Sequence, residues 1–309
     1  MASVGTYRAR VRVGNWREDI ALEEDSLKDF LTRKERGELT VQKTSVLKEN
    51  ILKPVNLSVS QNGFLRFGDR VMLVNSRGLT FDPSGACALS IVADLSNVTS
   101  HPPASSEPCL KGPCQVSGAS SLRPCIRNAF VVTSVDGTPD GETLRYEQNF
   151  TLRTTSGFAG ELYLASDHRK FEKCAKMSRL QEVSLVERPD FLCWWRVAYF
   201  DPQERLEHEG YPVQVNTKVL ITHCKTNQCL AALDNLVLWT LFGKEYEVTA
   251  HTFLDSHKAE RYSNHWQFVT ADPGEQEQTL QQLQPAATIT IPDQQDPNAL
   301  TDTVQEVES

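Results

Sequence analysis

The sequence lacks several features that would place it in a common functional class. No apolar run approaches the roughly 20 residues of a transmembrane helix. The first residues carry Arg8, Arg10 and Arg12 where a secretory signal peptide would have its apolar stretch. Neither the phosphate-binding pattern Gly-x-x-x-x-Gly-Lys-Ser/Thr nor the dinucleotide-binding pattern Gly-x-Gly-x-x-Gly occurs. We therefore expect a cytoplasmic chain without a membrane span, and no nucleotide-dependent enzyme.

The cysteines also lack the spacing of a metal site. Structural zinc sites contain a close Cys-x-x-Cys pair, and this pair is missing from the one cysteine-rich segment, which contains Cys109, Cys114 and Cys125. Cys224 and Cys229 flank a turn, and we interpret them as the ends of paired strands with His223 as a surface neighbour. We expect no catalytic residue, no metal and no cofactor, and hence no enzymatic activity.

Positive charge is missing from the end of the chain and is balanced by negative charge in the rest. The net charge is −8, but seven acidic residues and no Lys or Arg follow Pro273, so residues 1–273 carry only −1. With a pI of about 5.5 and a single arginine cluster, the chain is not expected to bind nucleic acid. Residues 274–309 are acidic and rich in Gln, Pro and Thr, a composition that predicts a disordered tail.

What the sequence does contain is an internal threefold repeat. The opening phrases align without a gap: Phe67-Gly-Asp-Arg-Val-Met-Leu73, Tyr146-Glu-Gln-Asn-Phe-Thr-Leu152 and Val215-Asn-Thr-Lys-Val-Leu-Ile221. Each copy closes on an aromatic residue and alternating apolar positions: Phe130-Val-Val-Thr-Ser134, Trp195-Arg-Val-Ala-Tyr199 and Trp266-Gln-Phe-Val-Thr270. Both ends recur in the same order, so the repeat is the feature that most narrows the fold.

The spacing of the copies predicts an all-β β-trefoil over residues 62–273. Opening phrases lie 79 and 69 residues apart, which is too long for a solenoid coil, and three copies are too few for a typical propeller. Alternating apolar positions are typical of strands with one face in a core. Phe130, Trp195 and Trp266 are expected to line one threefold cap. The predicted core consists of Val71, Leu73, Phe130, Phe150, Leu152, Trp195, Val219, Ile221 and Trp266.

Residues 1–61 differ from the repeats and are predicted to form an arm. The segment Tyr7-Arg-Ala-Arg-Val-Arg-Val13 alternates Arg with Ala or Val, which indicates an extended stretch with one basic face. A helix is predicted from Asp19 to about Arg36, and a second from Ser45 to Leu52. Two interpretations stay open: the arm packs on its own barrel, or it reaches a partner, since Arg and aromatic residues are enriched at interfaces.

The first repeat is interrupted by residues 96–125, which are rich in Ser and Pro. This segment shows no periodicity, and stretches of this length without periodicity are usually functional loops or disordered. We expect a long projecting loop. A contact loop and a mobile insertion are both compatible with the composition.

Several motifs resemble a known β-trefoil module. They are Gly68-Asp69, Asn149 and Asn216 before apolar strands, His223-Cys-Lys-Thr-Asn-Gln-Cys-Leu-Ala231 and His265-Trp-Gln-Phe268. They look like the MIR-type β-trefoil of protein O-mannosyltransferases and inositol trisphosphate receptors. This resemblance implies a MIR-like fold over residues 62–273.

A second resemblance covers almost the whole chain. Its segments are Val11-Arg-Val-Gly-Asn-Trp16, Leu22-Glu-Glu24, Lys28-Asp-Phe-Leu31, Pro54-Val-Asn-Leu-Ser58 and Phe67-Gly-Asp-Arg-Val-Met-Leu-Val-Asn75. Together they resemble the cilia- and flagella-associated protein 161 family. That family implies a non-catalytic microtubule inner protein of the axoneme in motile cilia and flagella, which binds the luminal wall of doublet microtubules and stabilises them.

The implied partners are α/β-tubulin and neighbouring microtubule inner proteins. Tubulin is acidic, so a basic arm would offer it complementary charge. The candidate tubulin-binding residues are Arg8, Arg10, Arg12, Trp16 and Arg17. No membrane partner is expected.

Two other functions stay open. The first is a MIR-type module that binds a glycan or an inositol phosphate, although the repeats lack the Gln-x-Trp signature of ricin-like trefoils. The second is an adaptor whose trefoil binds peptides. The close basic group of the barrel, interpreted as a solvated charged loop, contains Lys170, Lys173, Lys176 and Arg179.

Overall fold

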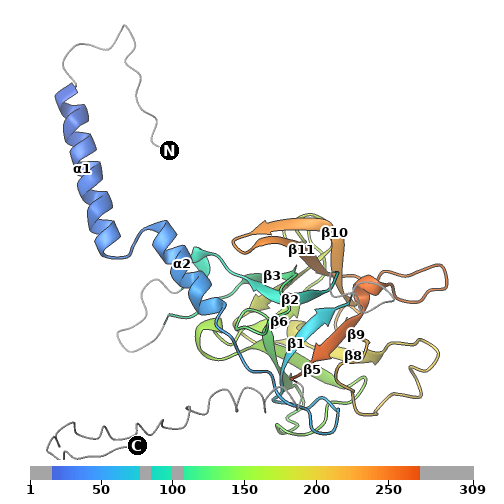
Figure 1. The fold of residues 1–309 in the computed structure, drawn as a ribbon. Helices are drawn as coiled ribbons and strands as arrows, with labels where there is room; N and C mark the ends of the chain where they lie inside the picture. The colour runs from blue at the N-terminus through green and yellow to red at the C-terminus, as the bar shows by residue number, and fades with distance from the viewer. Residues whose placement is uncertain (1–15, 77–84, 99–107, 272–309) are drawn as a thin grey trace, which may run out of the picture. The chain divides into compact units, whose positions relative to one another are not determined.

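The computed structural model describes residues 16–76, 85–98 and 108–271, and for Trp16 it describes the backbone only. Two helices precede a β-domain, as Figure 1 shows. The predicted extended segment with Arg8, Arg10 and Arg12 lies outside the described residues, as does the predicted tail of residues 274–309.

Both predicted helices are present, and each begins earlier than predicted. Helix α1 spans Trp16–Glu35 and α2 spans Thr40–Ile51. Acidic residues occupy the first turn of α1 and basic residues its last turn, an arrangement that complements the helix dipole. Pro54 follows α2 closely and would prevent the helix from continuing.

Twelve strands in the described residues provide four for each repeat. The first repeat contains β1 (Arg70–Asn75), β2 (Cys87–Val92), β3 (Cys114–Ala119) and β4 (Ala129–Ser134). The second contains β5 (Asn149–Thr154), β6 (Tyr163–Ser166), β7 (Gln181–Val186) and β8 (Trp195–Tyr199). The third contains β9 (Val219–His223), β10 (Leu230–Thr240), β11 (Gly243–Ala250) and β12 (Trp266–Val269).

The strand pairing confirms the predicted β-trefoil. The first and last strands of the repeats pair in the closed order β1, β4, β5, β8, β9, β12 and back to β1, so they form a six-stranded barrel. The middle strands form three hairpins, β2–β3, β6–β7 and β10–β11. Strands β3, β7 and β11 also pair with one another, so the hairpins form a triangle.

The register repeats with the same threefold symmetry. In each repeat the closing aromatic residue pairs with one opening strand on either side. The three sets are Phe130 with Val71 and Thr154, Trp195 with Phe150 and His223, and Trp266 with Val219 and Asn75. The sequence alignment of opening and closing phrases therefore holds residue by residue.

The turn before each opening strand is also equivalent. Its second residue has a positive φ in all three repeats: +86° at Gly68, +65° at Glu147 and +57° at Asn216. Each donates its backbone N–H, at 2.8 to 2.9 Å, to a carbonyl of the closing strand two positions after the aromatic residue. A left-handed glutamate is uncommon, so the turn geometry here is set by the barrel and not by residue preference.

All nine predicted core residues have 0% exposure. The expected cap residues Phe130, Trp195 and Trp266 lie on the barrel strands β4, β8 and β12. The indole N–H groups of Trp195 and Trp266 donate to the Leu164 and Leu230 carbonyls, each at 2.9 Å. These carbonyls belong to β6 and β10, so the tryptophans tie the barrel to the hairpins.

The predicted loop of residues 96–125 was too long, because Cys114–Ala119 form strand β3. The segment has little β-branched or aromatic character, yet it pairs with β2 on one side and with β7 and β11 elsewhere along its length. Tertiary pairing overrides weak strand propensity here. Gly118 allows the close approach, since a Cβ atom there would lie 2.8 Å from the Cys87 Sγ.

The two helices of the arm differ in whether they pack on the barrel. Leu47 and Ile51 of α2 are buried in the main core, and the Ile51 carbonyl accepts a hydrogen bond from the Arg127 N–H at 3.0 Å. Helix α2 therefore packs on the barrel. In contrast, every described side chain of α1 is exposed.

Candidate partner-binding surface

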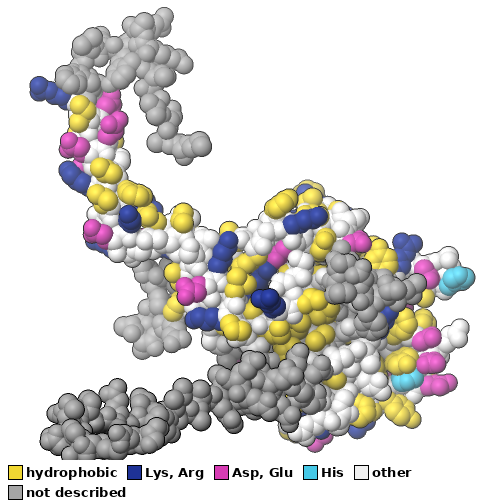
Figure 2. All heavy atoms as spheres, in the orientation of Figure 1, with side chains coloured by type: hydrophobic (Ala, Val, Ile, Leu, Met, Phe, Trp, Pro, Cys, Tyr) yellow, Lys and Arg dark blue, Asp and Glu magenta, His cyan; other side chains and the backbone are white. Residues whose placement is uncertain are grey.

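Helix α1 carries an apolar stripe that is exposed to solvent. Ile20, Leu27, Phe30 and Leu31 recur at helical spacing and therefore lie on one face. Their exposed fractions are 47, 58, 45 and 45%. Figure 2 shows hydrophobic side chains along α1 among charged ones. Exposed apolar faces rimmed by charge mark interaction sites, so α1 is the first candidate for partner contact.

The charge of α1 is acidic, unlike that of the segment before it. The helix contains seven acidic and four basic residues. Two exposed ion pairs, Lys28–Asp25 and Arg33–Asp29, span 3.6 Å each, and such pairs contribute little to stability. Any attraction of α1 to an acidic partner must therefore come from its apolar stripe or from the residues at its start.

The structure describes only part of the predicted tubulin-binding set. Arg17 is exposed on the first turn of α1, and Trp16 is the first residue of that helix. The side chain of Trp16 lies outside the described part, and so do the three other arginines. Of the two interpretations left open for the arm, the exposure of Phe30 and Leu31 favours partner contact for α1.

A buried ion pair lies between the hairpins and the barrel. Arg127 and Glu245 are 4% and 2% exposed, and their Nη1 and Oε1 atoms lie 2.6 Å apart. Glu245 Oε2 also accepts hydrogen bonds from Arg127 Nη2, Ser117 and Thr240, and Arg127 Nε donates to the Ile91 carbonyl. Because both charges are paired and shielded from solvent, this network is structural. No sequence pattern connects two residues so far apart in the chain.

The thiols of Cys114, Cys193 and Cys224 are unsuited to nucleophilic chemistry. Burial raises the pKa of Cys114 to about 12, and it raises the pKa values of Cys193 and Cys224 to about 11. A reactive cysteine requires a lowered pKa. Among residues 16–76, 85–98 and 108–271, no group of three His, Cys, Asp or Glu side chains could hold a metal ion.

None of the described helices is both long and apolar enough to cross a membrane.

His223 was predicted to be a surface residue, and the structure shows that this was wrong: it is completely buried. Its Nε2 lies 2.9 Å from the Leu192 carbonyl and its Nδ1 lies 2.9 Å from the Thr226 hydroxyl. A carbonyl only accepts, so Nε2 carries the proton. The residue interpreted as a surface neighbour of the turn is the last residue of β9, and it is buried because it pairs with Trp195 on the adjacent strand β8.

Stability is expected to decline below about pH 6.5, partly through His223. Burial is the main cause that lowers the pKa of His223 from 6.5. The unfolded chain then binds a proton more readily than the folded chain, so the stability contribution is full above the unfolded pKa and is lost as pH falls through the folded pKa. The loss is at most about 1.4 kcal/mol for each pH unit.

Urea unfolding at pH 7.5 and 5.5 checks this pH dependence when wild type is compared with His223→Gln. The variant should lose less stability on acidification, because its side chain does not titrate. Equal losses in the two proteins would show that His223 does not contribute.

Comparison with known proteins agrees with the resemblance seen in the sequence. Residues 43–271 match the family model described as "Cilia- and flagella-associated protein 161-like domain". A Danio rerio protein named cilia- and flagella-associated protein 161 is 66% identical over 284 residues, which cover 92% of this chain and 94% of the relative. Proteins of the same name from Bos taurus and Mus musculus are 45% and 41% identical, over 90% and 89% of this chain and 86% and 91% of theirs.

Solved structures with a similar chain path are distant in sequence. The SDF2-like protein from Arabidopsis thaliana is 16% identical with a TM-score of 0.46, covering 68% of this chain and 98% of that chain. The S. cerevisiae protein O-mannosyltransferase Pmt1-Pmt2 complex is 15% identical with a TM-score of 0.43, covering 74% and 27%. The strand pairing described above defines the β-trefoil without them. By its family match and its relatives, the chain belongs to the cilia- and flagella-associated protein 161 family, a family of cilia and flagella.

Proposed function

We propose that this chain is a non-catalytic microtubule inner protein of the axoneme that binds the luminal wall of doublet microtubules and stabilises them. Family membership supports the ciliary context. The observation that carries the proposal is the exposure of α1, whose apolar stripe leaves Ile20, Leu27, Phe30 and Leu31 open to a partner. The proposed partners are α/β-tubulin and neighbouring inner proteins.

The parts of the chain have different tasks in this proposal. The trefoil is a compact body, because its barrel is closed and its core is continuous with the hairpins. Helix α2 is fixed to that body by Leu47 and Ile51. Helix α1 then offers the apolar contact, and Arg8, Arg10, Arg12 and Arg17 offer positive charge to the acidic tubulin surface. No step of this role requires a reactive group.

Removing the apolar stripe is expected to release the protein from axonemes. The variant Ile20→Ala, Leu27→Ala, Phe30→Ala and Leu31→Ala keeps helix propensity, since alanine is the best helix former. Its affinity for demembranated axonemes should fall by about tenfold or more, equivalent to about 1.4 kcal/mol. The measurement is the fraction retained in the pellet after detergent extraction and a salt series. Thermal unfolding of the trefoil should change little, because all four side chains are exposed.

A matched control is available on the opposite face of α1. Glu18, Leu22, Asp25 and Asp29 have helical spacing and exposed positions, and changing all four to alanine should leave retention nearly unchanged. Reversing Arg8, Arg10 and Arg12 to Glu should weaken retention most at low salt, and the difference from wild type should shrink as salt increases, because salt screens the charges. Release of wild type with the membrane and matrix fraction at low salt would contradict the proposed function.

A further inference from the structure

The β6–β7 hairpin carries a strongly basic connection on a nearly neutral domain. Residues 168–179, which we name the basic loop, contain one acidic and five basic residues. The equivalent β10–β11 connection is a tight turn between Thr240 and Gly243. The basic side chains, all exposed, are Arg169, Lys170, Lys173, Lys176 and Arg179. The β2–β3 connection, residues 93–113, is longer but contains two acidic residues and one basic residue, so the basic loop differs from both of the others in charge.

Much of this charge is not neutralised within the described part of the chain. Lys170 lies 3.6 Å from Asp167. Among the described residues, Lys173 and Lys176 form no ion pair within 4 Å, although both act on the nearby Glu182 carboxyl and oppose the rise in its pKa that burial causes. The loop thus presents a local positive field that its own fold compensates only in part.

A buried carboxylate fixes the backbone of the basic loop. Glu247 of β11 is 3% exposed, and its two oxygens accept hydrogen bonds from the Met177 and Ser178 N–H groups at 2.7 and 2.8 Å. The Ala175 N–H also donates to the carbonyl of Leu180, the residue directly after the loop, at 2.9 Å. A loop held in this way loses little conformational entropy when a ligand binds.

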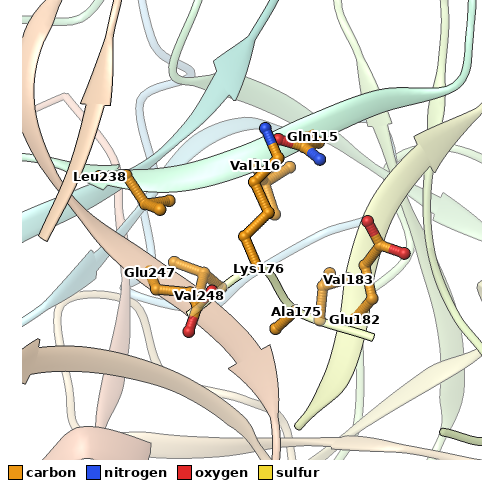
Figure 3. A pocket seen from close by; sticks show the side chains of 9 residues that line it. All are labelled: Gln115, Val116, Ala175, Lys176, Glu182, Val183, Leu238, Glu247 and Val248. Carbon is orange, nitrogen blue, oxygen red and sulfur yellow. The ribbon is translucent and has the colours of Figure 1, made fainter. Parts of the chain in front are cut away.

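The loop borders hollows that combine polar and apolar walls. Lys173 lines a hollow of about 300 Å³ whose other walls include the apolar Ala165, Val186 and Leu192 and the carboxylates Asp167 and Glu182. Figure 3 shows a smaller hollow beside it, where Lys176 lies between Leu238 of β10 and Glu182 of β7. Apolar side chains accompany the bases at the surface, since Phe171 is 99% exposed and Met177 is 56% exposed.

We propose that the basic loop docks an extended acidic peptide segment of a partner protein. Acidic side chains would meet Lys170, Lys173 and Lys176, and an apolar residue of the same segment would contact Phe171 or enter the hollow beside Lys173. A nucleic acid fits less well, because phosphate binding relies on positive charge spread along a groove, whereas residues 1–273 carry a net −1. The docking site does not depend on the proposed function.

Charge reversal of the loop tests this proposal. The probe is a fluorescein-labelled peptide of about 16 residues that combines Glu with occasional Leu, followed by anisotropy with the full chain. Changing Lys170, Lys173 and Lys176 to Glu is expected to weaken binding by about tenfold or more. The control changes three exposed bases elsewhere, Lys53, Arg70 and Arg123, to Glu and should weaken it by less than about twofold.

Two further measurements distinguish an acidic peptide from other ligands of the basic loop. Phe171→Ala should weaken peptide binding by about threefold without a change in the thermal unfolding temperature, because the ring is exposed. Equal losses in the loop and control variants would overturn the proposal, since they would indicate unspecific charge attraction. Binding to phosphatidylserine vesicles or to an oligonucleotide that depends on the loop, while the acidic peptide does not bind, would also overturn it.

Discussion

Replacing Trp195 by alanine is expected to lower the free energy of unfolding by about 3–5 kcal/mol, the range of large aromatic truncations in cores. Trp195 is completely buried on β8 and packs at 4.9 Å, between ring centroids, against the His223 ring. Its indole donates to the Leu164 carbonyl at 2.9 Å. The substitution therefore leaves a cavity and also removes a hydrogen bond between the barrel and the β6–β7 hairpin.

The neighbouring tryptophan is the matched control for this prediction. Trp194 is 36% exposed, and Trp194→Ala should cost less than about 1 kcal/mol, as surface substitutions usually do. Urea unfolding of both variants gives the comparison. If Trp195→Ala cost as little as Trp194→Ala, the threefold register that places Trp195 in the core would be wrong.

Replacing Glu245 by glutamine is the second large effect, with an expected loss of about 3–5 kcal/mol. The change leaves the Arg127 guanidinium buried without a countercharge, although it is held at the Ile91 carbonyl and over the Phe242 ring at 3.8 Å. Glu245 connects β11 to β3 through Ser117. The loss should therefore include weaker pairing within the hairpin triangle.

A double substitution separates the burial of charge from the loss of packing. Replacing Arg127 by Met and Glu245 by Leu removes both charges, and it should recover much of the stability that Glu245→Gln loses. The surface control is Asp29→Asn, which removes the exposed pair with Arg33 and should change stability by less than about 0.5 kcal/mol. A double variant as unstable as Glu245→Gln would show that the ion pair itself, and not the uncompensated charge, stabilises the fold.

The fold could be predicted from the sequence because the repeat fixes both ends of each unit. The opening and closing phrases became the six barrel strands, and Phe130, Trp195 and Trp266 occupy equivalent register positions. Strand β3 could not be predicted, because Cys114–Ala119 becomes a strand through its partners and not through its own side chains. Because the residues before β3 are rich in Pro and Ser, the sequence does not indicate where the predicted loop of residues 96–125 ends.

Less of the candidate partner-binding surface could be predicted from the sequence, because the exposure of a side chain depends on how the chain folds. The sequence suggests a helical stripe of Leu22, Leu27, Phe30 and Leu31, but such a pattern is equally typical of a helix packed on its own domain. In α1, Leu22 lies on the opposite face from the other three. Leu47 and Ile51 in α2 do pack on the barrel. The burial of His223 likewise depends on its cross-strand position opposite Trp195, to which no local pattern points.

Electron cryo-microscopy of isolated doublet microtubules tests the proposed function most directly. The account predicts trefoil density, with its closed six-stranded barrel and hairpin triangle, on the luminal wall. It also predicts that the apolar stripe of α1 contacts tubulin or a neighbouring inner protein. Trefoil density on the outer surface of the doublet would contradict the account. So would an empty luminal wall in axonemes that still contain the protein after extraction.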